Sequence, residues 1–213
     1  MYNEDKNILL NCCWTLDYIK GDSESKIDIL MKSNVVPKLI ELLEYSYSFK
    51  LSSPTHAIVI PALKVIGSIT TGSSLQIQCI VNFGLISRLN MLLDSPNSYI
   101  RKNTVWIFSN LMADSSDYTQ ALLISGIMKK LARLAVQDSH EVKYESMWAL
   151  SNACITVKPE LIKPLIELEV VEILCLGLTM KDMELVAEIL VGLESLLKSS
   201  EVIINNTIEK KCG

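Results

Sequence analysis

A ten-residue segment of this chain occurs twice, 42 residues apart, with the same side chains at three matching positions. The copies are residues 101–110 (RKNTVWIFSN) and 143–152 (KYESMWALSN), and each places Ser three residues and Asn four residues after Trp. On a helix, positions i and i+4 lie on one face, so each copy presents an indole beside an amide. A motif that returns at a fixed spacing predicts an array of stacked units.

The register of this repeat extends along most of the chain. Lys64, Trp106, Trp148 and Leu190 are each separated by 42 residues, and Trp14 precedes Lys64 by 50. An insertion of eight residues, which the polar stretch 46–55 can accommodate, explains the longer interval. We call these five residues the markers. The residue before each marker is apolar, and the residue two after it is apolar or small, in the order Cys13/Leu16, Leu63/Ile66, Val105/Phe108, Met147/Leu150 and Ile189/Gly192.

Apolar residues at helical spacing predict three helices in each unit. The predicted helices are 2–20; 25–33, 35–45 and 56–71; 75–83, 85–94 and 98–112; 117–125, 127–137 and 140–155; and 159–168, 170–180 and 183–199. Small or polar breaks separate the first and second helix of each unit, at Ser33-Asn34, Phe83-Gly84, Ser125-Gly126 and the region of Glu169. Three helices with a period near 40 residues are typical of armadillo repeats. The sequence therefore predicts an all-α, right-handed superhelical solenoid of about four repeats plus a partial N-terminal repeat.

The expected domain organisation follows from the same register. We expect one armadillo-repeat domain over residues 1–200, in which residues 1–21 form the last helix of a partial repeat. The complete repeats are expected at 23–72, 74–113, 115–156 and 158–200, followed by a C-terminal tail at 201–213. The tail is too short to complete another unit.

Composition and charge exclude several classes of function. The net charge of −4 argues against a nucleic-acid-binding protein, which needs a basic face to displace phosphate counterions. No signal peptide and no apolar stretch of membrane-spanning length is apparent, so we expect no membrane partner. The six cysteines contain no CxxC pair, which favours a reducing compartment, cytosol or nucleus. His56 and His140 begin helices in different repeats without ligand or triad spacing, so we expect no enzyme activity, metal or cofactor.

The marker helices carry a regular series of side-chain pairs whose chemistry indicates what they could bind. We call each marker with the residue four after it a rung, and the rungs are Trp14/Tyr18, Lys64/Ser68, Trp106/Asn110, Trp148/Asn152 and Leu190/Glu194. Indoles attract Lys or Arg heads by about 0.5–2 kcal/mol per contact. Asn can bond both the N–H and the C=O of an extended peptide, and Glu145 and Glu194 can receive ammonium groups. A Trp at helical spacing is more often core, but a column that accepts Trp, Lys and Leu indicates a surface.

Several of these segments resemble the importin alpha (karyopherin alpha) family, in the C-terminal half of its armadillo array. The resemblance covers about residues 8–200 and is carried by Trp14-x-x-x-Tyr18, residues 61–72 (PALKVIGSITTG), WIFSN at 106–110, WALSN at 148–152 and Gly192-Leu193-Glu194. It implies binding of Lys/Arg-rich nuclear localisation signals of cargo proteins in a concave groove. Residues matching the family's minor site are Trp106, Asn110, Trp148 and Asn152, with Ser109 and Glu145 alongside.

The chain differs from the family at two positions of the rungs, and the resemblance implies a cellular location. Lys64 stands where the family usually has Arg, and Ser68 stands where it has Asn, which weakens one backbone clamp. The implied setting is shuttling between cytoplasm and nucleus, with importin beta and an export receptor engaged through regions absent or truncated here. No Lys/Arg-rich N-terminal segment of the kind that docks importin beta is expected in this chain.

Two other interpretations are open at this stage. A generic armadillo scaffold for signalling, adhesion or the cytoskeleton would bind another extended peptide. Lys102 and Lys143, four and five residues before the two tryptophans, are compatible with a groove of mixed charge. A degenerate fragment whose N-terminal helix lacks a neighbour would fold poorly.

Overall fold

The computed structural model describes residues 6–19, 24–46 and 56–212, with side chains described at 7–18, 27–44 and 57–201. All regular secondary structure in these ranges is helical. The chain forms two compact units, Met1–Ile107 and Phe108–Gly213, and the division falls inside helix α7 (Ser98–Asp114). Within the described ranges, no helix combines the length and apolarity needed to cross a bilayer.

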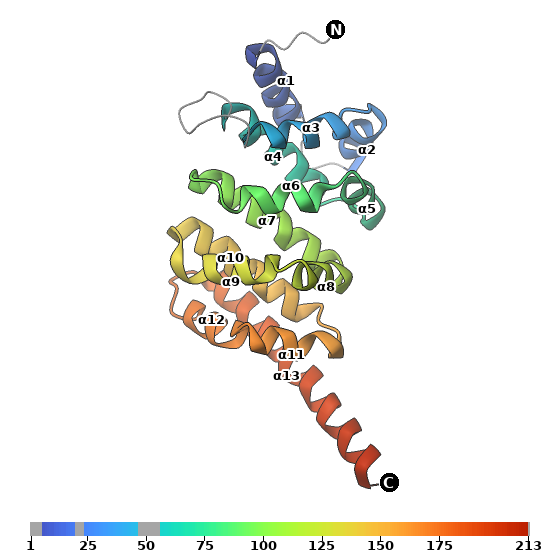
Figure 1. Cartoon of the computed structure of the whole chain (residues 1–213), viewed down its shortest axis with the longest axis vertical. Helices are drawn as coiled ribbons and strands as arrows, with labels where there is room; N and C mark the ends of the chain where they lie inside the picture. The colour runs from blue at the N-terminus through green and yellow to red at the C-terminus, as the bar shows by residue number, and fades with distance from the viewer. Residues whose placement is uncertain (1–5, 20–23, 47–55, 213) are drawn as a thin grey trace. The chain divides into compact units, whose positions relative to one another are not determined.

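The first unit is organised around helix α4. Its elements are α1 (Lys6–Ile19), α2 (Glu24–Lys32), α3 (Val36–Leu42), the 3-10 helix η1 (Leu43–Ser46), α4 (His56–Ile69), α5 (Ser74–Asn82), α6 (Leu85–Leu92) and the first part of α7. α4 packs against α1, α3 and η1, and α6 packs against η1 and α5 (Figure 1). The helix predicted at 35–45 is therefore α3 followed by η1. The predicted insertion at 46–55 lies outside the described residues beyond Ser46.

The second unit is organised around helix α10. It contains the end of α7 and then α8 (Ser116–Ile124), α9 (Ile127–Gln137), α10 (His140–Ile155), α11 (Pro159–Glu167), α12 (Val170–Gly177) and α13 (Met183–Cys212). α10 packs against α9, α12 and α13. The prediction that the last helix ends at residue 199 was wrong, because α13 continues to Cys212 (Figure 1). No Gly or Pro occurs between Gly192 and Gly213, so nothing local stops the helix.

A left-handed residue ends the first helix of each repeat. Asn34, Gly84, Gly126 and Glu169 have φ values of 56°, 80°, 73° and 57° and are the positive-φ residues of the described chain. All four lie at the predicted breaks, so these predictions are confirmed. Glycine adopts this conformation without steric cost and Asn tolerates it, whereas a Glu there carries strain.

Burial confirms the register. The residue before each marker is buried in all five helices, and the residue two after is buried in four, with Leu16 of α1 half-buried. The markers themselves are different. Trp14 is 42 % exposed, Leu190 is 52 % exposed, and the other three are partly exposed. The marker column is therefore at the surface, next to the core face of each helix.

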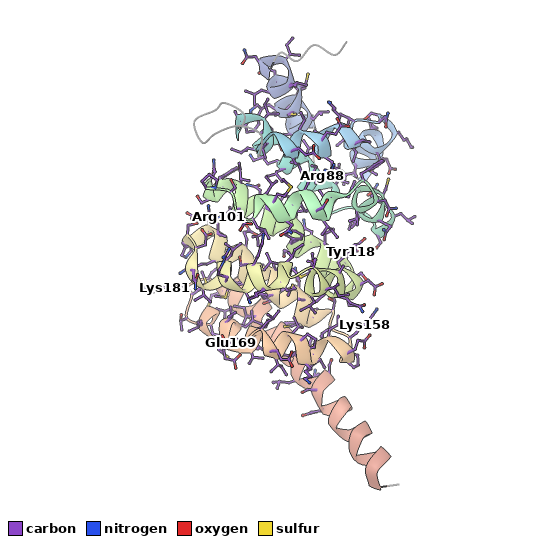
Figure 2. The ribbon with its side chains drawn as sticks, in the orientation of Figure 1. Arg88, Arg101, Tyr118, Lys158, Glu169 and Lys181 are labelled. Carbon is purple, nitrogen blue, oxygen red and sulfur yellow. The ribbon has the colours of Figure 1, made fainter. Side chains whose placement is uncertain are left out.

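Exposed ion pairs join neighbouring repeats inside each unit. In the first unit, Arg88 of α6 donates to Glu44 of η1 at 2.6 Å. In the second unit, Lys158, the N-cap residue of α11, donates to Asp117 of α8 at 2.5 Å. Figure 2 labels Lys158 and Arg88. The hydrogen bond and the charge of Asp117 raise the pKa of Lys158. Such solvent-exposed pairs add little stability, so packing of the buried columns holds the repeats together.

Candidate functional site

The first two rungs meet through Lys64. Its Nζ lies 5.2 Å from the ring centroid of Trp14 on α1 and 5.9 Å from that of Tyr99 on α7. The same Nζ is 3.9 Å from Asp17 Oδ2. The sequence predicted Trp14 and Lys64 as two peptide contacts, and the structure places them against each other. Tyr18, in contrast, is 91 % exposed.

Asp17 and Tyr99 were not predicted as members of this cluster. Asp17 is three residues after Trp14, which is a helical neighbour, so its position could have been noticed. Tyr99 comes from a helix 35 residues beyond Lys64, and no local signal links the two. We call Trp14, Asp17 and Tyr99 the cation cage, because two aromatic rings and a carboxylate surround one ammonium group.

Trp106 of the third rung lies against the backbone of α4. A Cβ added to Gly67 would come within 2.7 Å of Trp106 Cε3 and within 2.9 Å of Cη2, so no side chain fits under the indole. Gly67 is three residues after its marker, where the later repeats have Ser109 and Ser151. The indole is partly exposed, so this contact orients a ring that reaches the surface.

Ser68 and Asn110 occupy the second position of their rungs. Ser68 Oγ donates to the carbonyl of Lys64 at 3.1 Å, within its own helix. Its hydroxyl proton is therefore used within the helix. Asn110 lies one turn after Trp106 on α7 and is partly exposed.

Asn152 of the fourth rung is fixed by the preceding repeat. Its Nδ2 donates to Ser109 Oγ at 2.9 Å and to Ser109 O at 3.2 Å. One turn further along α10, Thr156 Oγ1 donates to Met112 O at 2.9 Å. Ser109 is only 4 % exposed, so its position is that of a support for Asn152. The amide donor is committed to the protein, and the oxygen is the end that can accept from a ligand.

Trp148 is accompanied by a second aromatic ring on its own helix. Tyr144, one turn earlier on α10, has its ring centroid 6.4 Å from that of Trp148, with the planes tilted by 56°. Both side chains, and Glu145 between them in sequence, are partly exposed. The arrangement puts two ring surfaces and one carboxylate on a single helix segment. Tyr144 was not predicted, although its i, i+4 spacing to Trp148 was visible in the sequence.

The last rung is aliphatic and acidic. Leu190 and Glu194 are exposed on α13, and Glu194 Oε1 lies 2.6 Å from Lys198 Nζ on the same helix. The hydrogen bond from Lys198 and its charge lower the pKa of Glu194. The carboxylate therefore stays ionised at neutral pH, and a basic ligand would compete for it with Lys198.

Two thiols of the marker helices, Cys13 and Cys154, are core groups. Burial, with a contribution from the neighbouring Cys12, raises the pKa of Cys13 to about 11. Burial raises the pKa of Cys154 to about 12. Both stay protonated at neutral pH and act as packing groups. Across the described ranges, no three His, Cys, Asp or Glu side chains gather as a metal-binding group.

Known proteins resemble the chain in both sequence and fold. The family model of the armadillo/beta-catenin-like repeat matches residues 73–113. Importin subunit alpha-8 of Arabidopsis thaliana is 29 % identical over 203 residues, covering 94 % of this chain and 44 % of the relative. Importin subunit alpha-1b of Oryza sativa subsp. japonica is 32 % identical over 202 residues, covering 94 % and 36 %. Importin subunit alpha-4 of Arabidopsis thaliana is 33 % identical over 202 residues, with the same two coverages of 94 % and 36 %.

The chain thus spans less than half the length of these three curated relatives. Two solved structures establish its fold class. A designed armadillo repeat protein in complex with the peptide (KR)4 superimposes with a TM-score of 0.77 at 23 % identity, covering 91 % of this chain and 77 % of the design. A second designed armadillo repeat protein reaches a TM-score of 0.78 at 24 % identity, covering 98 % and 87 %. The predicted all-α armadillo fold is confirmed.

Proposed function

This chain belongs to the importin alpha family of armadillo-repeat proteins, and we propose that it binds Lys/Arg-rich nuclear localisation signals for protein import into the nucleus. The observation that carries the proposal is the repeated Trp-x-x-Ser-Asn rung, in which a partly exposed indole is followed one turn later by a partly exposed amide. The relatives are named importin subunit alpha, and one structural neighbour was solved with the peptide (KR)4.

The two Trp/Asn rungs supply the two kinds of contact that an extended basic peptide needs. The apolar stem of a Lys or Arg lies along the face of Trp106 or Trp148. The cationic head then gains about 0.5–2 kcal/mol from the ring, and Glu145 lies three residues before Trp148 to receive it. A peptide N–H donates to the oxygen of Asn152, whose Nδ2 is held by Ser109. Asn110 acts in the same way on the third rung.

The remaining predicted residues have supporting roles in this proposal. The carboxylate of Glu194 attracts a cationic side chain at the last rung, and exposed Tyr18 offers a ring surface at the first. The net charge of −4 favours encounter with a basic peptide, an effect that salt weakens. The protein acts as a carrier rather than an enzyme, and it shuttles between cytoplasm and nucleus. Importin beta and an export receptor belong to the same proposal as partners that bind elsewhere than on the rungs.

A generic armadillo scaffold is the second candidate. Lys102 of α7 and Lys143 of α10 are both partly exposed near the two Trp/Asn rungs. Two such lysines would favour an extended peptide that carries acidic residues. The sign of the charge that the rungs select therefore separates the two functions.

The deciding experiment is a binding titration by fluorescence anisotropy. A labelled Lys/Arg-rich peptide and its Glu-substituted version are titrated with the protein over a salt series. The proposal expects saturable binding of the basic peptide, weaker at high salt and lost in Trp106→Ala/Trp148→Ala. Phe83→Ala is the matched control, because it removes an exposed aromatic ring (45 % exposed) at the end of α5, a helix that carries no rung.

Circular dichroism of every variant establishes that the helices are intact before binding is compared. A folded protein that binds neither peptide would overturn the proposal. Saturable binding of the Glu-substituted peptide alone would favour the generic scaffold.

A further inference from the structure

The cation cage of the first unit is already filled by a residue of the chain. Lys64 Nζ lies over Trp14 at 5.2 Å and over Tyr99 at 5.9 Å, with Asp17 Oδ2 at 3.9 Å. The side chains of Lys64 and Asp17 are 28 % and 15 % exposed, so the ion pair is partly shielded from water. Three helices, α1, α4 and α7, contribute to this one cluster.

The chemistry of this cluster is what a rung would offer to a lysine of a bound peptide. It has aromatic faces for the ammonium group, an apolar surface for its stem, and a carboxylate for its charge. On the other two tryptophan rungs, Trp106 rests on Gly67 and Trp148 pairs with Tyr144. The first two rungs therefore carry their own cation.

We propose that Lys64 is a built-in occupant of the Trp14/Asp17/Tyr99 cage, and that it excludes a peptide's Lys or Arg from this site. The consequence is a boundary: a basic peptide is bound by the Trp/Asn rungs, and the Trp14/Asp17/Tyr99 site is closed to its cationic side chains. The exclusion rests on the proposed function, whereas the occupancy does not. Removal of the Lys64 side chain uncovers a latent site for an alkylammonium group.

Occupancy is tested without any peptide. Reductive methylation with 13C-formaldehyde labels the lysines as dimethylamines, which keep their positive charge, and NMR then records their methyl resonances. The Lys64 signal, assigned by its loss in Lys64→Met, is expected upfield of the other lysines because the rings of Trp14 and Tyr99 shield it. In Trp14→Leu, the Lys64 resonance should move most of the way back toward the chemical shifts of the other lysines. An unshifted Lys64 signal overturns the inference.

Exclusion is tested by comparing two variants that remove the same charge. Lys64→Ala empties the cage, whereas Lys64→Met fills it with an apolar chain of similar length. Lys129→Met, at an exposed position on α9, is the matched control for charge. A peptide with Lys/Arg residues along 16 to 20 positions, a length of about 50 Å or more when extended, is titrated with each.

Exclusion predicts that Lys64→Ala binds between about twofold and thirtyfold more tightly than the parent protein, the range that one cation–π contact supplies. The dissociation constants of Lys64→Met and Lys129→Met for the peptide should equal each other and lie close to that of the parent protein. If Lys64→Ala and Lys64→Met gained affinity equally, the cause would be the removal of charge repulsion. That result would overturn the proposed exclusion and leave the proposed function standing. A shifted Lys64 signal with no binding by any variant would overturn the proposed function and the exclusion together, leaving only the occupied cage.

Discussion

The contact between Gly67 and Trp106 gives the most direct test of the packing described here. Alanine at position 67 would place its Cβ 2.7 Å from Cε3 and 2.9 Å from Cη2 of the indole. Carbon atoms in contact are separated by about 3.5–4.0 Å, so the ring must move by about 1 Å or more. Trp106 is partly exposed and can swing outward, whereas the α4 backbone is held in a buried helix.

The magnitude follows from two opposing terms. Overpacking of this kind costs about 1–3 kcal/mol. Replacing Gly by Ala inside a helix returns about 1 kcal/mol through its higher helix propensity. The net expectation for Gly67→Ala is therefore a loss of up to about 2 kcal/mol in the free energy of unfolding. Urea denaturation followed by circular dichroism measures this loss, and a red shift of the Trp emission reports the displaced indole.

A double-mutant cycle separates the two terms. In a Trp106→Leu background the ring is absent, and Gly67→Ala should then stabilise the protein by about 1 kcal/mol through propensity alone. The sign of the effect thus depends on Trp106. If Gly67→Ala stabilised the parent protein by the same amount and left its emission unchanged, the reasoning about this contact would be refuted.

Three further predictions concern the second unit and the buried thiols. Asn152→Ala should lower the free energy of unfolding by about 1–2 kcal/mol, measured by urea titration. The loss should be smaller in a Ser109→Ala background, because the Ser109 hydroxyl that accepts from Asn152 is then already absent. Glu169→Gly should raise the free energy of unfolding by up to about 1 kcal/mol, because glycine relieves the strain of the left-handed backbone at φ 57°. An unchanged denaturation midpoint would contradict this. Burial raises the pKa of Cys13 and Cys154 to about 11 and 12, so the stability from their neutral thiols is present below about pH 9 and falls as pH rises toward those values. Alkaline denaturation curves should be flatter when both are Ala, and parallel curves would count against the assignment.

The marker register shows how far sequence patterns reach. The repeat of 42 residues placed Cys13, Val105 and Ile189 in the core and Trp14 and Leu190 at the surface, as the structure has them. The left-handed residues Asn34, Gly84, Gly126 and Glu169 lie at the small or polar breaks that the sequence places between the first and second helix of each repeat. These features are predictable because they depend on helix periodicity and on backbone sterics, which act between near neighbours along the chain.

The sequence was less informative wherever side chains from different repeats compete for one position. It listed Lys64, Asn152 and Ser109 as residues facing a ligand. In the structure Lys64 lies in the cage of Trp14 and Tyr99, and Asn152 donates to buried Ser109. The choice between ligand and protein partner is made by rotamers and by neighbours at least 35 residues away in sequence. The repeat period therefore determined the fold and the rungs, and only tertiary packing decided which rungs already hold a partner.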